Sequence, residues 1–181
     1  FKFKEAFAPQ FIIDCAASLG KPARSCLDPF GGSGTSALTA QFLGIRPTTI
    51  EVNPFLADLI EAKLSTYDVA RLRSDYLEVL RVSKEVRPTA AQMLAAAPAT
   101  LIEPGVDERW IYSKGVARRI LALREAIGQV KSRSNRLLFT VVLGSILVGL
   151  SNVIVNGKGR KYRHGWQERQ RPGPSLSRGA P

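Results

Sequence analysis

The N-terminal third of the sequence, residues 1–66, alternates between helical and strand patterns. Apolar positions over residues 1–20 recur at helical spacing. Residues 25–30 form a short apolar segment that predicts a buried strand, and the β-branched residues 48–52 predict a second one. Helices are expected after each strand, over residues 35–43 and 55–64. The order strand, helix, strand, helix predicts the start of a parallel α/β sheet.

The pattern changes after residue 66. Residues 67–97 are helical and rich in alanine and charge, and residues 114–130 predict an amphipathic helix. The apolar residues 137–155 approach the length of a membrane span. Glycines and a Ser-Asn pair lower the hydropathy of this segment, so we expect a buried core helix rather than a span.

The C-terminal residues are basic and rich in glycine and proline, which predicts a flexible tail. The sequence therefore divides into three regions: an α/β segment over 1–66, a helical insert or continuation over 67–155, and a basic tail over 156–181.

Composition and charge narrow the classes of function. The 181 residues include 26 Lys and Arg against 15 Asp and Glu, a net charge of +11 that favours a polyanionic partner such as nucleic acid. Two cysteines, Cys15 and Cys26, and a single histidine, His164, exclude a disulfide scaffold and predict no metal site. The sequence begins with Phe1 and shows no signal segment, so we expect a fragment of a cytoplasmic protein.

A glycine-rich turn follows the first predicted strand. It reads Asp28-Pro29-Phe30-Gly31-Gly32-Ser33-Gly34-Thr35. Such glycines let a backbone turn tightly and approach a ligand closely, and the next helix offers free N–H groups. Glu51 follows the turn at close to the spacing of about 20 residues at which a carboxylate binds the hydroxyls of a ribose. The pattern therefore predicts a nucleoside site.

Asp28 distinguishes between nucleoside cofactors. A carboxylate before the glycines repels the pyrophosphate of NAD. It attracts the sulfonium and ammonium groups of S-adenosylmethionine, which carries no phosphate. The sequence therefore favours S-adenosylmethionine, and an NAD-dependent oxidoreductase remains a less favoured alternative.

The glycine turn, followed by Glu51-Val52-Asn53-Pro54, resembles the cofactor-binding half of DNA amino-methyltransferases, which methylate adenine N6 or cytosine N4. The resemblance covers residues 2–64. It implies a Rossmann-like α/β fold, here partial and with a helical insert, S-adenosylmethionine as cofactor and DNA as substrate. It also implies these cofactor-binding residues: Phe7, Pro9, Phe11, Asp28, Pro29, Phe30, Gly31, Gly32, Ser33, Gly34, Thr35, Glu51 and Asn53.

One family motif is missing. The catalytic sequence of these enzymes is Asp, Asn or Ser, then Pro-Pro, then an aromatic residue, and this sequence contains no Pro-Pro dipeptide. We therefore expect no methyl transfer by these residues alone and assign no catalytic residue. The alternatives are a non-catalytic cofactor- or DNA-binding subunit completed by a second chain, and an RNA methyltransferase.

The start of the predicted tail mixes basic and aromatic residues. Tyr162 and Trp166 interleave with the charge, a combination suited to phosphate contacts and base stacking. The alternative is a solvated tail without a ligand. The candidate DNA-binding residues are Lys158, Arg160, Lys161 and Arg163.

Overall fold

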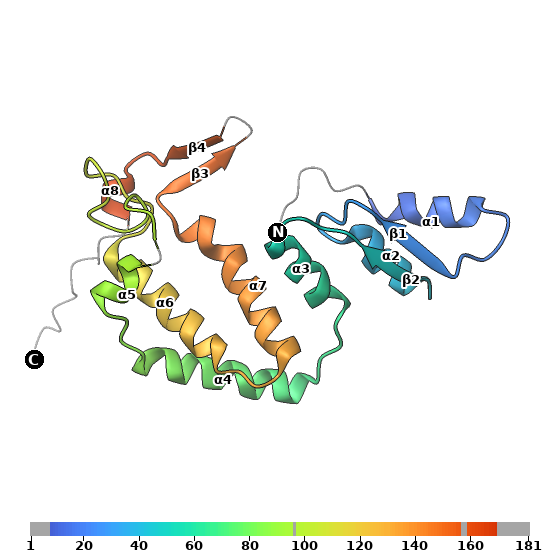
Figure 1. The fold of residues 1–181 in the computed structure, drawn as a ribbon, viewed down its shortest axis with the longest axis horizontal. Coiled ribbons are helices and arrows are strands. Elements are labelled where there is room, and N and C mark those ends of the chain that lie inside the picture. Colours follow the sequence, from blue (N-terminus) through green and yellow to red (C-terminus); the bar gives the residue numbers. More distant parts are fainter. Residues whose placement is uncertain (1–7, 96, 157–158, 170–181) are drawn as a thin grey trace, which may run out of the picture. The chain divides into compact units, whose positions relative to one another are not determined.

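The computed structural model describes residues 8–95, 97–156 and 159–169 (Figure 1). The chain divides into two compact units, unit 1 from residues 1–75 and 130–145, and unit 2 from residues 76–129 and 146–181. Each unit holds helices and a two-stranded sheet, so the described part of the chain is mixed α/β. The three regions suggested by composition do not coincide with these units, and their boundaries stay predictions.

The sheet of unit 1 is parallel. Strand β1 (Ser25–Asp28) pairs with β2 (Arg46–Thr49), and α2 (Thr35–Phe42) connects them. This confirms the predicted order of strand, helix and strand. The second strand lies earlier than the predicted residues 48–52. The amide of Ile50 still donates to the carbonyl of Asp28 at 2.9 Å, after which the backbone leaves the ladder because β1 has ended.

Two further helices complete the N-terminal part of unit 1. Helix α1 (Pro9–Ser18) packs beside α2, and α3 (Pro54–Leu64) follows β2. Asn53 caps α3, because its side-chain oxygen accepts a hydrogen bond from the amide of Phe55 at 3.0 Å. The apolar face of α3 forms a core with α7 (Arg133–Leu150), made of Phe55, Leu56, Leu59, Ala62, Leu137 and Val141.

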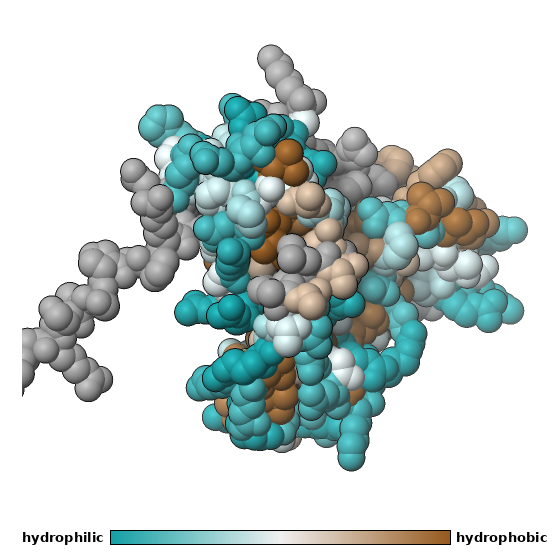
Figure 2. Space-filling view, turned by 60° about the vertical axis from the view of Figure 1, so that its left-hand side comes forward, coloured by the Kyte–Doolittle hydropathy of each residue, from teal (hydrophilic) through white to brown (hydrophobic). Residues whose placement is uncertain are grey.

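One face of the β1–β2 sheet is uncovered by the described residues. Leu27 is 64% exposed, and the residues that follow the strands are also exposed, Phe30 at 87% and Val52 at 93%. Figure 2 shows apolar side chains at the surface, among hydrophilic ones. Parallel sheets in proteins have both faces covered. The described sheet therefore lacks neighbours that a complete parallel sheet has.

Unit 2 combines helices with a β-hairpin. Its elements after α4 (Val69–Glu85) are α5 (Ala90–Ala95), α6 (Lys114–Gly128), the antiparallel strands β3 (Val153–Asn156) and β4 (Gly159–Tyr162), and α8 (Trp166–Arg169). The helix expected over 67–97 is interrupted before α5, near Pro88, because proline disfavours helical backbone in the residue before it. Strand β3 lies at the end of the region expected to be helical, and β4 and α8 occupy the start of the predicted flexible tail, whereas residues 170–181 lie outside the described part.

Helix α7 differs from its expected environment. Within the described residues it is the one helix long and apolar enough to cross a membrane, with 18 residues and a mean hydropathy of 1.3. The prediction that this segment is a buried core helix is wrong, because its buried residues are Asn135 and Val141. Its contacts with α3 involve Leu137, Val141 and Gly144, and the residues Val142, Ile146, Val148 and Leu150 are exposed.

Candidate cofactor site and nucleic-acid interface

The glycine turn connects β1 to the N-terminus of α2. The amide of Gly31 donates to the carbonyl of Ile50 at 2.9 Å, and the amide of Gly34 donates to the carbonyl of Gly31 at 2.8 Å. Gly34 has a φ of 81° and is the N-cap of α2. A Cβ there would lie 2.9 Å from Cγ1 of Ile60. Backbone conformation and close packing against α3 both require glycine at this position.

Glu51 joins the glycine turn to the start of α3. Its Oε2 accepts the amide of Gly32 at 2.7 Å, and its Oε1 accepts the amide of Asn53 at 2.7 Å. Glu51 is half-buried. Each carboxylate oxygen can accept more than one hydrogen bond, so the two backbone contacts orient the group without using all of its acceptor capacity.

Asp28 is the last residue of β1 and is half-buried. Its Oδ1 accepts the amide of Phe30 at 3.0 Å, the contact of an Asx turn, which fixes the carboxylate at the entrance to the glycine turn. Asp28 thus lies at the carboxyl end of β1, and Glu51 follows the carboxyl end of the neighbouring parallel strand β2. Ligands in open α/β sheets bind at this edge.

Lys63 contacts the glycine turn, and the sequence did not predict this contact. Its ammonium, on α3, donates to the backbone carbonyl of Ser33 at 2.6 Å. No motif connects the two positions, which lie 30 residues apart, and only the packing of α3 brings them together. The turn is therefore held from two sides, by the Glu51 carboxylate and by the Lys63 ammonium.

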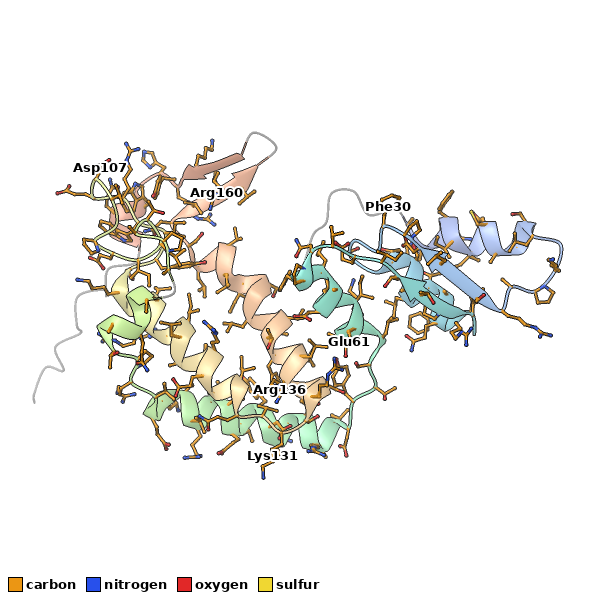
Figure 3. All side chains as sticks on the ribbon, in the orientation of Figure 1. Phe30, Glu61, Asp107, Lys131, Arg136 and Arg160 are labelled. Carbon is orange, nitrogen blue, oxygen red and sulfur yellow. The ribbon has the colours of Figure 1, made fainter. Side chains whose placement is uncertain are left out.

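A cavity of about 470 Å³ lies beside β2 and α3. Its lining includes Glu51 and Glu61, and Figure 3 labels Glu61 on α3. The carboxylate of Glu61 binds the guanidinium of Arg133, with Nη2 of Arg133 3.1 Å from Oε2, and this contact raises the pKa of Arg133. The volume is in the range of small-molecule sites. Its lining residues are Thr49, Glu51, Ala57, Ile60, Glu61, Leu64 and Ser65.

The other predicted cofactor residues lie in different places. Pro9 and Phe11 are exposed on α1, and Phe7 lies outside the described residues. Pro29 and Phe30 are exposed next to the turn. The hydroxyls of Ser33 and Thr35 are 3.4 Å apart at the start of α2. The structure thus brings together the residues from Asp28 to Thr35 with Glu51 and Asn53.

The basic residues in and next to the hairpin differ in exposure and in hydrogen bonding. Arg160 and Lys161 are exposed on β4, and Lys158 lies outside the described residues. The guanidinium of Arg163 instead donates to the carbonyls of Ser151 and Val148, both at 3.2 Å. These carbonyls lie at the C-terminus of α7, where the helix dipole favours a cation. Arg163 therefore stabilises the end of α7, and the exposed candidates for phosphate contact are Arg160 and Lys161.

Comparisons with known proteins identify two partial relatives. The chain is 31% identical over 83 residues to the type II methyltransferase M.MjaII of Methanocaldococcus jannaschii, and 32% identical over 85 residues to the type II methyltransferase M.BsoBI of Geobacillus stearothermophilus. These matches cover 46% and 45% of this chain, but 16% and 17% of the relatives. No family model and no solved structure matches. Part of the chain is thus similar to a small part of two type II methyltransferases.

Proposed function

We propose that residues 1–66 bind S-adenosylmethionine and form part of a DNA methyltransferase that acts on the exocyclic amine of adenine or cytosine. The observation that carries this proposal is the pair of carboxylates after neighbouring strands, Asp28 and Glu51, on either side of a glycine turn. The similarity to two type II methyltransferases supports DNA as the substrate.

The chemistry of the cofactor matches these groups one by one. Glu51 keeps acceptor capacity for the two ribose hydroxyls while the backbone amides of Gly32 and Asn53 hold it in place. Asp28 offers negative charge to the ammonium or sulfonium. The first turn of α2, which no side chain caps, offers its amides to the carboxylate of the methionine part. When bound, the cofactor supplies an electrophilic methyl group, and the residues of this chain bind and orient it.

The sheet face that the described residues leave uncovered supports a role completed by further polypeptide. The exposed Leu27 of β1 and the missing Pro-Pro motif both agree with a catalytic site that needs residues outside these 181. This polypeptide would continue the sheet and carry the group that accepts hydrogen bonds from the target amine. The same observations fit a cofactor-binding subunit of a split methyltransferase.

Thermal unfolding with added cofactor tests the assignment. We expect S-adenosylmethionine to raise the melting temperature and NAD to leave it unchanged, because a ligand that binds only the folded state stabilises it. Asp28→Asn should reduce the shift, and Asp107→Asn in unit 2 serves as a control with the same change of charge. A shift with NAD but not with S-adenosylmethionine would instead support the oxidoreductase alternative.

A further inference from the structure

A second cavity, of about 620 Å³, lies within unit 2. It is formed by the loop between α5 and α6 together with the end of β4 and α8. Both tryptophans of the sequence line it, Trp110 and Trp166, with ring centroids 4.9 Å apart in an edge-to-face arrangement. The ring of Tyr162 lies 4.8 Å from that of Trp166. The cavity thus has an aromatic wall, and we call it the aromatic pocket.

Carboxylates line the same pocket. Asp107 and Glu108 form the tip of a tight turn in which the amides and carbonyls of Val106 and Arg109 bond to one another, at 2.9 and 3.2 Å. Asp107 has a φ of 49° and Glu108 a φ of 57°. A third carboxylate, Glu103, is held by the amide of Lys114 at 3.1 Å. Three acidic side chains and one basic side chain, Arg109, therefore line the pocket with the aromatic rings.

An aromatic wall with carboxylates fits a flat ring that carries amino groups. Unpaired bases stack on aromatic side chains, and Asp or Glu accepts hydrogen bonds from an exocyclic amine such as cytosine N4. Thymine has no such amine. Considered without its surroundings, the pocket would also fit a cationic ligand. Unit 2, however, contains 15 basic against 7 acidic residues, and this net charge of +8 repels cations.

The same positive charge attracts a polyanion. Arg160 is exposed on β4, the strand that ends at Tyr162 in the pocket wall, and Figure 3 labels both Arg160 and Asp107. Lys161 is its exposed neighbour. The basic side chains on the hairpin are suited to bind the phosphate of a nucleotide. The carboxylates and aromatic rings of the cavity are suited to bind its base.

We propose that the aromatic pocket binds an unpaired, amino-bearing nucleobase of DNA, while Arg160 and Lys161 contact the adjoining phosphates. This inference rests on the proposed function in one respect, the choice of DNA as partner. It concerns a site in unit 2, separate from the candidate cofactor residues of unit 1.

Tryptophan fluorescence tests it directly, because both tryptophans of the chain lie in the pocket. The full chain is titrated with single-stranded oligo-dC, oligo-dA and oligo-dT of equal length, without cofactor. We expect oligo-dC and oligo-dA to quench the fluorescence and to bind about fivefold or more tightly than oligo-dT, the scale of one base-specific contact.

The double variant Asp107→Asn with Glu108→Gln separates base recognition from bulk electrostatics. If the carboxylates accept hydrogen bonds from the base, the variant loses affinity for oligo-dC and oligo-dA and no longer discriminates against oligo-dT. If only phosphates are bound, removing two negative charges tightens binding of all three oligonucleotides alike, and the proposal is wrong. Glu125→Gln, on the exposed part of α6 and outside the pocket lining, is the control for loss of a surface charge and should leave the discrimination against oligo-dT unchanged.

Two other outcomes also overturn the inference. One is equal quenching by all three oligonucleotides in the unaltered chain. The other is quenching by a guanidinium-rich peptide with no response to any oligonucleotide, which would make the pocket a cation site. Since the titrations contain no cofactor, a failure to bind S-adenosylmethionine leaves them unaffected. Cofactor binding without base discrimination would contradict this inference alone.

Discussion

The amide of Gly32 donates a hydrogen bond to Oε2 of Glu51 at 2.7 Å, across 19 residues of sequence. The contact ties the turn after β1 to the loop after β2. Glu51 therefore stabilises the backbone of the turn in addition to making the proposed contact with ribose, so its substitution is expected to affect cofactor affinity.

Replacing Glu51 should weaken cofactor binding. Glu51→Ala removes the acceptor for ribose and for two backbone amides, so we expect an affinity loss of about 2–3 kcal/mol, within the range for hydrogen bonds to charged groups. Glu51→Gln keeps one acceptor oxygen and should lose less. Calorimetric titration with S-adenosylmethionine measures both, with Glu125→Gln as control. Equal affinity in the two Glu51 variants and the unaltered chain would refute the assignment of Glu51.

Gly34 and Gly31 should differ in their tolerance of a methyl group. Gly34→Ala places a Cβ at a φ of 81° and 2.9 Å from Cγ1 of Ile60, and we expect it to cost about 2 kcal/mol of unfolding free energy or more. Gly31→Ala meets the terminal Cδ1 of the same side chain at 2.8 Å, which can rotate away, so its cost should be smaller.

Urea unfolding measures this difference, and Gly115→Ala is the control. Gly115 lies within α6 with open space around its Cα, where alanine should be neutral or stabilising by up to about 1 kcal/mol. A Gly34 variant as stable as the Gly115 variant would show that the turn is looser than the structure indicates.

Substitution of Arg163 should affect mainly stability, whereas substitution of Arg160 or Lys161 on β4 should affect mainly DNA binding. Arg163→Ala removes two donors to the C-terminal carbonyls of α7, and we expect it chiefly to lower thermal stability. Arg160→Ala and Lys161→Ala should leave stability nearly unchanged and weaken DNA binding, each reducing the slope of log affinity against log salt by about 1.

Point variants are preferable to truncation here, because cutting the chain at Asn156 would remove β4 and expose β3. Binding to labelled single-stranded DNA at several salt concentrations supplies the slopes. Identical slopes for the unaltered chain and both β4 variants would exclude these residues as phosphate contacts.

Tyr112 should make unit 2 sensitive to high pH. Burial raises the pKa of Tyr112, and its hydroxyl donates to the carbonyl of Leu147 at 3.0 Å. The folded state thus holds this proton more tightly than the unfolded state, whose pKa is about 10. The stabilisation is complete below that pH and is lost as the pH rises through the folded pKa. The stability difference between the unaltered chain and Tyr112→Phe should be constant near neutrality and fall above about pH 10; parallel curves would contradict this.

The order of elements over residues 1–66 was predictable from local signals. Glycines after a strand, Asn53-Pro54 before a helix and a β-branched segment each restrict the backbone where they stand. The strand boundary at Thr49 was not predictable, because strand length depends on the partner, and β1 ends at Asp28. The break between α4 and α5 could have been predicted from Pro88. The helical pattern of the residues around it instead favoured one continuous helix.

The sequence alone determined the chemistry of the glycine turn, since steric freedom and charge at Asp28, Gly34 and Glu51 are properties of those residues themselves. Only the tertiary structure decided what each distant group contacts. Packing of α3 brings Lys63 to Ser33, the end of α7 engages Arg163, and the loop with Asp107 meets Trp166 across the aromatic pocket. The physical reason is that a hydrogen bond or ring contact depends on distance in space, and side-chain packing across the fold sets that distance.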